Sequence, residues 1–310
     1  MATASFDILC ADATPFFFLS DFEGKDLKCY PLDTLSDEDI EFSFNASGAP
    51  HRSALDKKPV DYETYKAKLE RVQEYIRCGE TYLLNLTQPT PIKCNDTLQA
   101  IYEKANAPFK LRFKEKFVCF TPEKFIEIID NRIYTYPMKG TIDASLPDAE
   151  KTILGDEKEM AEHLMVVDLL RNDLGIVATN IRVEKFRYID RIKAGSKELL
   201  QVSSKISGQL ESTWPSRIEA ILRALLPAGS ISGTPKKRTV EIIKEIEGYE
   251  RGYFTGVFGY FDGKNLYSAV SIRYIEQTPH GLIYKSGGGI TIDSDAQKEY
   301  EELIDKIYIP

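Results

Sequence analysis

Lys139 is the residue of this chain whose type and setting are best suited to chemistry. It lies in Pro137-Met138-Lys139-Gly140-Thr141, which we expect to form a small turn dominated by its backbone. Sixteen residues upstream, Glu123 supplies an acid, and two Glu-x-x-Glu pairs and two glycine-rich segments follow downstream. An amine, an acid, paired carboxylates and glycine loops are the parts needed to hold a small anionic substrate on a metal and to act on it.

The paired carboxylates have the spacing of neighbours on a helix. Glu159 and Glu162 lie three residues apart, and Glu299 and Glu302 repeat the arrangement. Residues i and i+3 share one helix face, so each pair repels unless something offsets its charge. In a chain with 48 acidic residues, a solvated acidic face explains one pair alone. Two such helices could instead face each other across a hard cation, and Mg²⁺ suits carboxylate ligands.

Two glycine segments and one arginine complete the set of candidate binding groups. Gly287, Gly288 and Gly289 follow a strand-like segment, where glycine lets the backbone approach a ligand and also forms flexible turns. Residues 229–233 precede a predicted helix, so they form either an anion site or a plain loop-to-helix junction. Arg273 lies in an apolar segment that we expect to be a strand. Its guanidinium needs a carboxylate, either from the protein or from a substrate.

The composition limits the kinds of partner. The 310 residues carry a formal charge of −8 and are 43% hydrophobic, which is typical of a globular protein and argues against nucleic-acid binding. The five cysteines are scattered and form no Cys-x-x-Cys pair, so neither a disulfide framework nor a thiolate metal site is expected. We also find no signal peptide and no membrane-spanning segment. A cytoplasmic location is therefore expected.

Hydrophobic periodicity predicts helices interspersed with hairpin-like strands. Local signals mark some helix ends: Asp61 as an N-cap, Thr234 before a proline, and Ser294 with Gln297 as a capping box. The predicted helices are 62–78, 156–173, 216–226, 235–247 and 296–307. The predicted strands are 16–19, 80–88, 117–120, 125–129, 132–136, 256–261, 268–275 and 282–285. This pattern indicates an α+β fold with mostly antiparallel sheets.

Several segments, in this order, resemble the chorismate-utilising enzymes. The matching segments are Gly79-Glu80-Thr81-Tyr82-Leu83-Leu84-Asn85-Leu86-Thr87-Gln88, the Lys139 segment, and residues 161–173, 229–236, 256–261 and 288–295. The resemblance covers residues 61–308 and is closest to a short form of aminodeoxychorismate synthase component I. It implies two stacked, mainly antiparallel β-sheets with surrounding helices. We expect residues 1–60 to be a trimmed N-terminal segment that adds strands to the core, without a tryptophan pocket. Residues 61–310 would be the catalytic region of one compact unit.

Lys139 distinguishes between activities within this family. Anthranilate synthases usually have alanine at this position, whereas aminodeoxychorismate synthases have lysine in a Pro-Ile-Lys-Gly-Thr segment that differs here only at Met138. Isochorismate and salicylate synthases use a lysine base at the position of Leu83, and leucine cannot act as a base. The resemblance therefore implies Mg²⁺-dependent, transaminase-type amination of chorismate at C4, giving 4-amino-4-deoxychorismate on the route to 4-aminobenzoate and folate. The alternatives are C2 amination, as in anthranilate synthase component I, and a non-catalytic chorismate-binding protein.

The resemblance also implies a role for each site residue. Lys139 would be the nucleophile and Glu123 the general acid. Mg²⁺ would be held by Glu162 and Glu302, with Glu159 and Glu299 acting through water. Chorismate would be bound by the guanidinium of Arg273 and by the backbone of four residues: Gly140, Thr141, Gly288 and Gly289.

The resemblance implies a partner as well. Ammonia would come from a glutamine amidotransferase subunit, because the chain has no cysteine in a nucleophile-elbow setting. Two positions depart from the family pattern. Gln201 lies where anthranilate synthases often have histidine, and Phe254 lies where some relatives have tyrosine or tryptophan.

Overall fold

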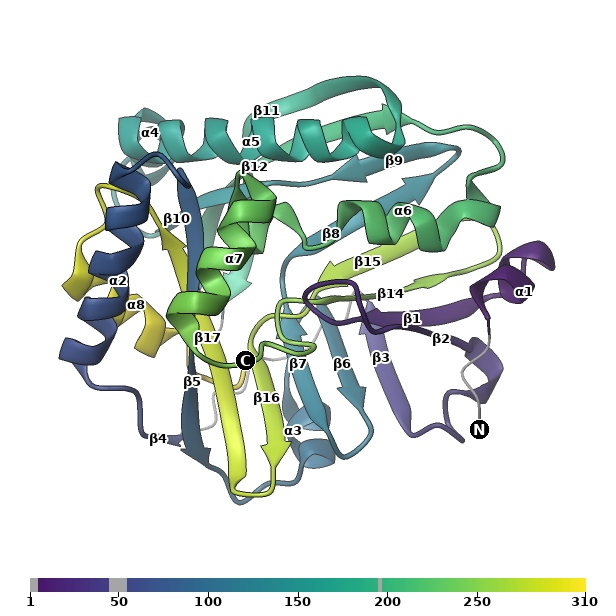
Figure 1. The fold of residues 1–310 in the computed structure, drawn as a ribbon, viewed down its shortest axis with the longest axis horizontal. Helices are drawn as coiled ribbons and strands as arrows, with labels where there is room; N and C mark the ends of the chain where they lie inside the picture. The colour runs from purple at the N-terminus through teal and green to yellow at the C-terminus, as the bar shows by residue number, and fades with distance from the viewer. Residues whose placement is uncertain (1–4, 45–54, 195–196) are drawn as a thin grey trace. The chain divides into compact units, whose positions relative to one another are not determined.

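The computed structural model describes residues 5–44, 55–194 and 197–310. The chain forms two compact units, each built from separate stretches of sequence. Unit 1 comprises Met1–Thr34, Glu123–Leu226 and Val257–Val270, and unit 2 comprises Leu35–Pro122, Pro227–Gly256 and Ser271–Pro310. Each unit contains one antiparallel sheet with helices packed against it (Figure 1). The predicted α+β fold with two antiparallel sheets is thus confirmed.

The sheet of unit 1 has the strand order β10-β12-β9-β8-β15-β14-β1-β2, and β11 pairs with β12. Its strands are β1 (Phe16–Ser20), β2 (Leu27–Pro31), β8 (Lys124–Ile129), β9 (Arg132–Thr135), β10 (Met138–Asp143), β11 (Thr179–Ala194), β12 (Lys197–Gln209), β14 (Val257–Phe261) and β15 (Leu266–Val270). Its helical segments are α1 (Phe6–Ala11), η1 (Leu32–Thr34), α4 (Ala149–Gly155), α5 (Glu157–Val177), η2 (Trp214–Arg217) and α6 (Ile218–Leu225). Helix α5 packs on β10, β11 and β12 and against α6 (Figure 1).

The centre of this sheet is apolar because its strands are buried on both faces. All five residues of β1 are buried, and Phe16 packs edge-on against Phe6 and at a tilt against Phe261. Apolar burial of this kind is the main stabilising term in a fold. The strand predicted at residues 16–19 is therefore confirmed as a core strand.

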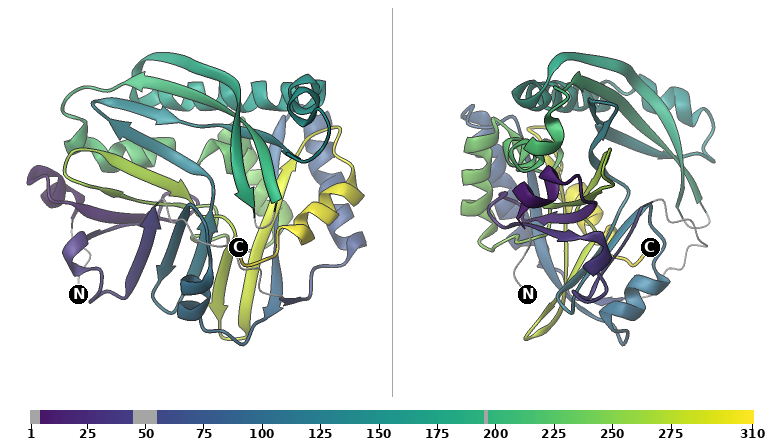
Figure 2. Two further views of the ribbon diagram at one scale, coloured as in Figure 1. Left: turned by 180° about the vertical axis from the view of Figure 1, so that it is seen from behind. Right: turned by 90° about the vertical axis from the view of Figure 1, so that its right-hand side faces the viewer.

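The sheet of unit 2 has the order β13-β5-β17-β16-β7-β6-β3, and β4 pairs with β5. Its strands are β3 (Ile40–Phe44), β4 (Asp56–Lys57), β5 (Leu83–Lys93), β6 (Phe109–Phe113), β7 (Phe117–Thr121), β13 (Gly233–Thr234), β16 (Tyr274–Thr278) and β17 (Gly281–Ile290). Its helical segments are α2 (Tyr62–Arg77), α3 (Leu98–Lys104), η3 (Gly229–Ile231), α7 (Lys236–Glu247) and α8 (Ala296–Asp305). Helix α8 runs beside β17 and α2, as the view from behind shows (Figure 2).

The first 60 residues contribute strands to both sheets. Strands β1 and β2 belong to unit 1, whereas β3 and β4 belong to unit 2. Among the described residues, no helix is both long enough and apolar enough to cross a membrane.

The helix ends follow the local signals only in part. Asp61 caps α2 as predicted and accepts a hydrogen bond from the Thr64 amide. Helices α7 and α8 form as predicted, but their predicted N-caps were wrong. Thr234 belongs to β13, where it pairs with Leu83, so Pro235 takes the N-cap position of α7. Asp295 caps α8, while the Ser294 hydroxyl donates to the Glu299 carboxylate.

Two candidate site segments also differ from the predictions. The glycine run is not a loop: Gly288 and Gly289 lie inside β17, opposite Leu86 and Asn85 of β5. Arg273 is not inside a strand: it lies between β15 and β16, where the chain passes from unit 1 to unit 2. The predicted strand 268–275 is thus divided between β15, which ends at Val270, and β16, which begins at Tyr274.

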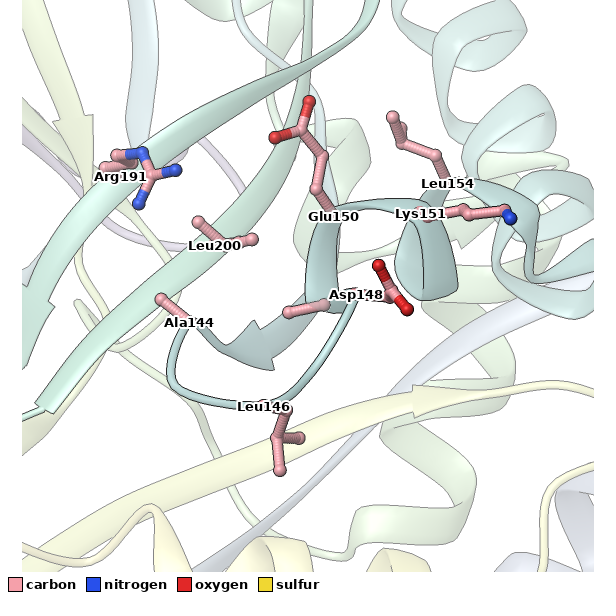
Figure 3. Close-up of a pocket in the computed structure, with 9 residues that line it drawn as sticks. Ala144, Leu146, Asp148, Glu150, Lys151, Leu154, Arg191 and Leu200 are labelled. Carbon is pink, nitrogen blue, oxygen red and sulfur yellow. The ribbon is translucent and has the colours of Figure 1, made fainter.

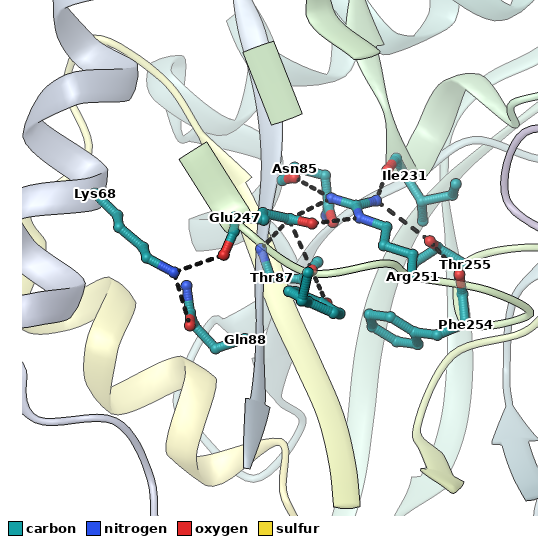
Figure 4. A network of polar contacts seen from close by, with 10 residues as sticks. Lys68, Asn85, Thr87, Gln88, Ile231, Glu247, Arg251, Phe254 and Thr255 are labelled. Carbon is teal, nitrogen blue, oxygen red and sulfur yellow. Dashed lines mark hydrogen bonds and ion pairs between the residues drawn. The ribbon is translucent and has the colours of Figure 1, made fainter. Parts of the chain in front are cut away.

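A buried ion pair fixes β5 opposite the glycine run. The Arg251 guanidinium donates to the Glu247 carboxylate and to the carbonyl oxygens of Asn85 and Ile231. Glu247 in turn accepts from the amide and hydroxyl of Thr87, so one polar network joins β5, η3 and α7 (Figure 4). Because both charged groups are buried and fully engaged, removing one would leave the other buried without a counter-charge.

Candidate active site

Lys139 lies at an irregularity in an edge strand. Strand β10 is the end strand of its sheet and pairs with β12, but the register shifts between Met138 and Thr141. Gly140, within this shift, has a φ of 90°, a backbone conformation that glycine adopts without strain. The expected turn is therefore a bulged strand, and bulges of this kind redirect side chains at sheet edges. Local sequence patterns did not indicate this strand, because its pairing with β12 is a contact between distant segments.

Helix α5 brings the first glutamate pair to this bulge. The Lys139 Nζ atom lies 3.9 Å from Glu162 Oε2, and the two side chains are 23% and 15% exposed. A Cβ atom on Gly140 would lie 3.2 Å from Glu159 Oε2. The structure therefore brings together Lys139, Gly140, Glu159 and Glu162, all within unit 1.

The surroundings of Glu159 disfavour the charged form of its carboxyl group. Burial raises the pKa of Glu159, and the neighbouring charge of Glu162 raises it further, whereas Lys139 acts in the opposite direction. The negative form of Glu159 is thus disfavoured by its surroundings and would be stabilised by added positive charge.

The neutral side chain of His163 links α5 to β12. His163, the residue after Glu162, is fully buried, and its Nε2 lies 2.6 Å from the Ser204 hydroxyl of β12. Burial, followed by the charge of Arg187, lowers the pKa of His163 to about 4. The imidazole is therefore uncharged near neutral pH.

The second glutamate pair lies beside the glycine run in unit 2. A Cβ atom on Gly288 would lie 3.5 Å from Glu299 Oε2 and 3.7 Å from Glu302 Oε1. Lys306, which the sequence analysis did not single out, lies 2.6 Å from Glu302 and donates to the Gly287 carbonyl oxygen at 2.8 Å. Its position one helical turn after Glu302 was the available signal. This group combines a glycine backbone, two carboxylates and an amine.

Glu123 and Arg273 lie next to the points where the chain changes unit. Glu123 is the first residue of unit 1 after unit 2, and its carbonyl oxygen accepts from the Val270 amide at 3.0 Å. Arg273 has a φ of 50°, and its guanidinium lies 4.8 Å from the centre of the Tyr308 ring. Both residues are partly exposed.

The glutamate pairs fit a hard divalent cation. Carboxylate oxygens are the ligands that Mg²⁺ prefers, and Mg²⁺ commonly takes only one or two of them from a protein. Across the described ranges, no cluster of three or more His, Cys, Asp or Glu side chains is arranged to hold a metal. Each unit thus offers two carboxylates beside a glycine. In unit 1 these are Glu159 and Glu162 beside Gly140. In unit 2 they are Glu299 and Glu302 beside Gly288.

A cavity of about 490 Å³ lies elsewhere in unit 1, beyond the end of β10 (Figure 3). Its apolar lining comprises Ala144, Leu146, Ala149, Leu154 and Leu200, and none of the predicted site residues borders it. Its two acidic and two basic lining side chains cancel in charge (Asp148, Glu150, Lys151 and Arg191). It therefore lacks the excess positive charge that would favour a dicarboxylate such as chorismate.

The family comparison agrees with this arrangement. The model of the chorismate binding enzymes matches residues 25–309. The chain belongs to the chorismate binding enzyme family. An "uncharacterized PabA-like protein" of Haemophilus influenzae is 50% identical over 96% of this chain and 92% of its own length. Aminodeoxychorismate synthase component 1 of Escherichia coli is 34% identical over 79% of this chain, which spans 56% of that protein.

Solved structures in this family have the same fold. Anthranilate synthase component I from Streptococcus pneumoniae superimposes with a TM-score of 0.69 at 28% identity, over 82% of this chain and 59% of that one. Relatives named anthranilate synthase and aminodeoxychorismate synthase are thus both similar to this chain, so the fold alone does not distinguish between these two activities.

Proposed function

We propose that this protein is an aminodeoxychorismate synthase that aminates chorismate at C4 through a covalent bond to Lys139. The observation that carries the proposal is the position of Lys139 on a bulged edge strand, with its amine beside the carboxylate of Glu162. The similarity to aminodeoxychorismate synthase component 1 supports it.

The proposed reaction is a pair of displacements. The uncharged Lys139 amine attacks C2 of chorismate, the two conjugated ring double bonds shift, and the C4–O bond breaks. Glu123 donates its proton to the departing hydroxyl, which leaves as water. Ammonia then attacks C4, both double bonds shift back, and the C2–N bond to Lys139 breaks. The product is 4-amino-4-deoxychorismate, from which 4-aminobenzoate and folate can be made.

The remaining candidate residues would bind and orient the substrate. The Arg273 guanidinium is suited to pair with the enolpyruvyl carboxylate, and the backbone of Gly140, Thr141, Gly288 and Gly289 can approach the ligand closely. Glu162 and Glu302, supported by Glu159 and Glu299, would hold Mg²⁺. When bound, Mg²⁺ would supply positive charge for the ring carboxylate of the substrate.

Ammonia requires a source, and we propose a glutamine amidotransferase subunit. This partner follows from the aminodeoxychorismate synthase activity proposed above. It would be tested by adding a glutaminase subunit to the purified protein and comparing glutamine with ammonium as nitrogen donor.

Product analysis tests the proposal directly. Purified protein, chorismate, Mg²⁺ and ammonium should give a species with the mass of aminodeoxychorismate, which an added lyase converts to 4-aminobenzoate. Formation of anthranilate would replace the proposal by C2 amination, which remains the second candidate because anthranilate synthase component I shares the fold. Chorismate that stabilises the protein without being consumed would indicate a non-catalytic binding protein.

A further inference from the structure

The Gln201 side chain lies at the irregular pairing of β10 with β12, beside Lys139. It lies on β12 directly opposite Thr141 of β10 and is only 9% exposed. The register shift takes Lys139 and Gly140 out of the regular ladder. Backbone groups at such a bulge need other hydrogen-bond partners when they are buried.

Both ends of the Gln201 amide contact the segment that carries Lys139. Its Nε2 donates to the Gly140 carbonyl oxygen at 2.9 Å, and its Oε1 accepts from the Thr141 hydroxyl at 2.7 Å. Nε2 also reaches the Val202 carbonyl oxygen of its own strand at 3.3 Å. One planar amide therefore holds two consecutive residues directly after Lys139.

Strand β12 gives this amide a fixed base. Gln201 is flanked by β10 on one side and by Asp190 of β11 on the other. A buried side chain on a strand paired along both edges has little freedom to move. The Lys139 segment, by contrast, belongs to an end strand and contains a glycine at positive φ.

We propose that Gln201 is a positioning residue that clamps Gly140 and Thr141 and thereby fixes the direction in which Lys139 leaves β10. Gln201 acts through Lys139 and does not itself take part in the chemistry. The functional consequence rests on the proposed role of Lys139 as nucleophile, whereas the clamp itself does not.

Three variants separate the two contacts of the clamp. Gln201→Leu keeps a side chain of similar size and removes both hydrogen bonds. Gln201→Glu keeps the acceptor for Thr141 and removes the donor to Gly140. Thr141→Val removes only the hydroxyl contact. Gln209→Leu is the matched control, because Gln209 lies on the same strand and its Nε2 donates to the carbonyl oxygens of Asn131 and Leu210.

Two readouts apply to each purified full-length variant. The first is kcat and KM for chorismate consumption, whatever the product. The second is the rate at which N-hydroxysuccinimide acetate acetylates Lys139, measured by peptide mass spectrometry relative to Lys264, whose side chain is 76% exposed. The second readout requires no turnover, so it tests the clamp even if the proposed function fails.

We expect Gln201→Leu to lower kcat by about tenfold with a smaller change in KM, because two hydrogen bonds that orient the nucleophile are lost. Acetylation of Lys139 should become faster, since the released segment exposes the amine. Gln201→Glu and Thr141→Val should have intermediate effects, and Gln209→Leu should match the wild type. A Gln201→Leu protein with wild-type kcat and wild-type acetylation would overturn the clamp. If that variant does not fold, Gln201→Glu and Thr141→Val decide by the same two readouts.

Discussion

The two glutamate pairs have the same spacing and lie in different settings. In unit 1, Glu162 and Lys139 are mostly buried, and the shortest distance between their charged atoms is 3.9 Å. In unit 2, Glu302 is 55% exposed, and Lys306 touches it at 2.6 Å while donating to Gly287 as well. The Lys139 amine is thus near a carboxylate without being at hydrogen-bond distance from it, whereas the Lys306 amine is held by two oxygen atoms.

Under the proposed function, this difference suits the two lysines to different tasks. An amine held by two acceptors is suited to neutralise charge and to stay in place. An amine in a mostly buried site, beyond hydrogen-bond distance of its neighbouring carboxylate, is better suited to turn and form a bond. The pairing of glutamate with lysine is therefore not in itself evidence of catalysis, and the local geometry decides.

The largest expected effect on kcat comes from replacing Lys139 by alanine, compared with the same replacement at Lys306. Lys139→Ala should lower kcat by about a thousandfold or more, because a covalent route is removed. Lys306→Ala should lower kcat less and act mainly on KM, since it changes only charge around the substrate. Steady-state kinetics with ammonium measure both, and Lys264→Ala is the exposed control. Equal losses of kcat in the two variants would show that Lys139 and Lys306 do not have different roles.

The second prediction concerns the framework of the unit 2 group. Arg251→Met should destabilise the fold by about 3–5 kcal/mol, because Glu247 would stay buried without its counter-charge. Arg71→Met, which breaks the exposed pair with Glu245, should shift the urea midpoint far less, because solvent screens an exposed ion pair. Urea unfolding followed by circular dichroism gives both values. Similar midpoints for the two variants would show that the buried network does not fix β5.

The third prediction uses the neutral histidine behind the unit 1 group. The folded-state pKa of His163 is about 4, below the ordinary value of 6.5, so the unfolded chain takes up a proton first as the pH falls. Stability from this group is complete above pH 6.5 and is lost between about pH 6.5 and pH 4, by up to about 3 kcal/mol. His163→Asn should flatten the pH dependence of unfolding in this range. His280→Asn, at an exposed histidine, is the matched control variant.

The smallest expected effect sharpens the comparison between the carboxylates. Glu162→Gln and Glu302→Gln should each raise the Mg²⁺ concentration needed for half-maximal activity by at least about tenfold, as expected when a ligand is removed. Mg²⁺ titrations at fixed chorismate measure this shift. Glu301→Gln, an exposed neighbour of Glu302 on α8, is the matched control. A shift in only one variant would restrict the metal to one unit.

Local sequence signals predicted the longer helices α2, α5, α6, α7 and α8 and missed the shorter α1, α3 and α4. The helix carrying Glu159 and Glu162 buries several apolar residues, among them Val166, Leu170 and Leu174. The helix carrying Glu299 and Glu302 begins at a side-chain cap, Asp295. The cap at Asp61 is likewise a short-range hydrogen bond that a sequence can specify.

The errors arise where distant segments pair. Gly288 and Gly289 have low strand propensity, yet β5 supplies a partner along the whole of β17 and overrides it. Thr234 was predicted to be a helix N-cap, but its backbone pairs with Leu83 of β5 in the two-residue strand β13. The long hairpin of β11 and β12, which supplies Gln201, was missed altogether. A single sequence contains no record of these contacts.

The interleaving of the two units has a consequence for how the chain can be made. Three stretches build each unit, and the last stretch of unit 1 ends at Val270, whereas unit 2 closes only with Ser271–Pro310. Strand β14 lies between β1 and β15, so a nascent chain that stops before residue 257 lacks the centre of the first sheet. Non-local assembly of this kind is slow and leaves unpaired edges exposed in the meantime. Fragments cut at any single position should therefore aggregate when expressed alone, and co-expressed halves should regain a fold only by assembling together.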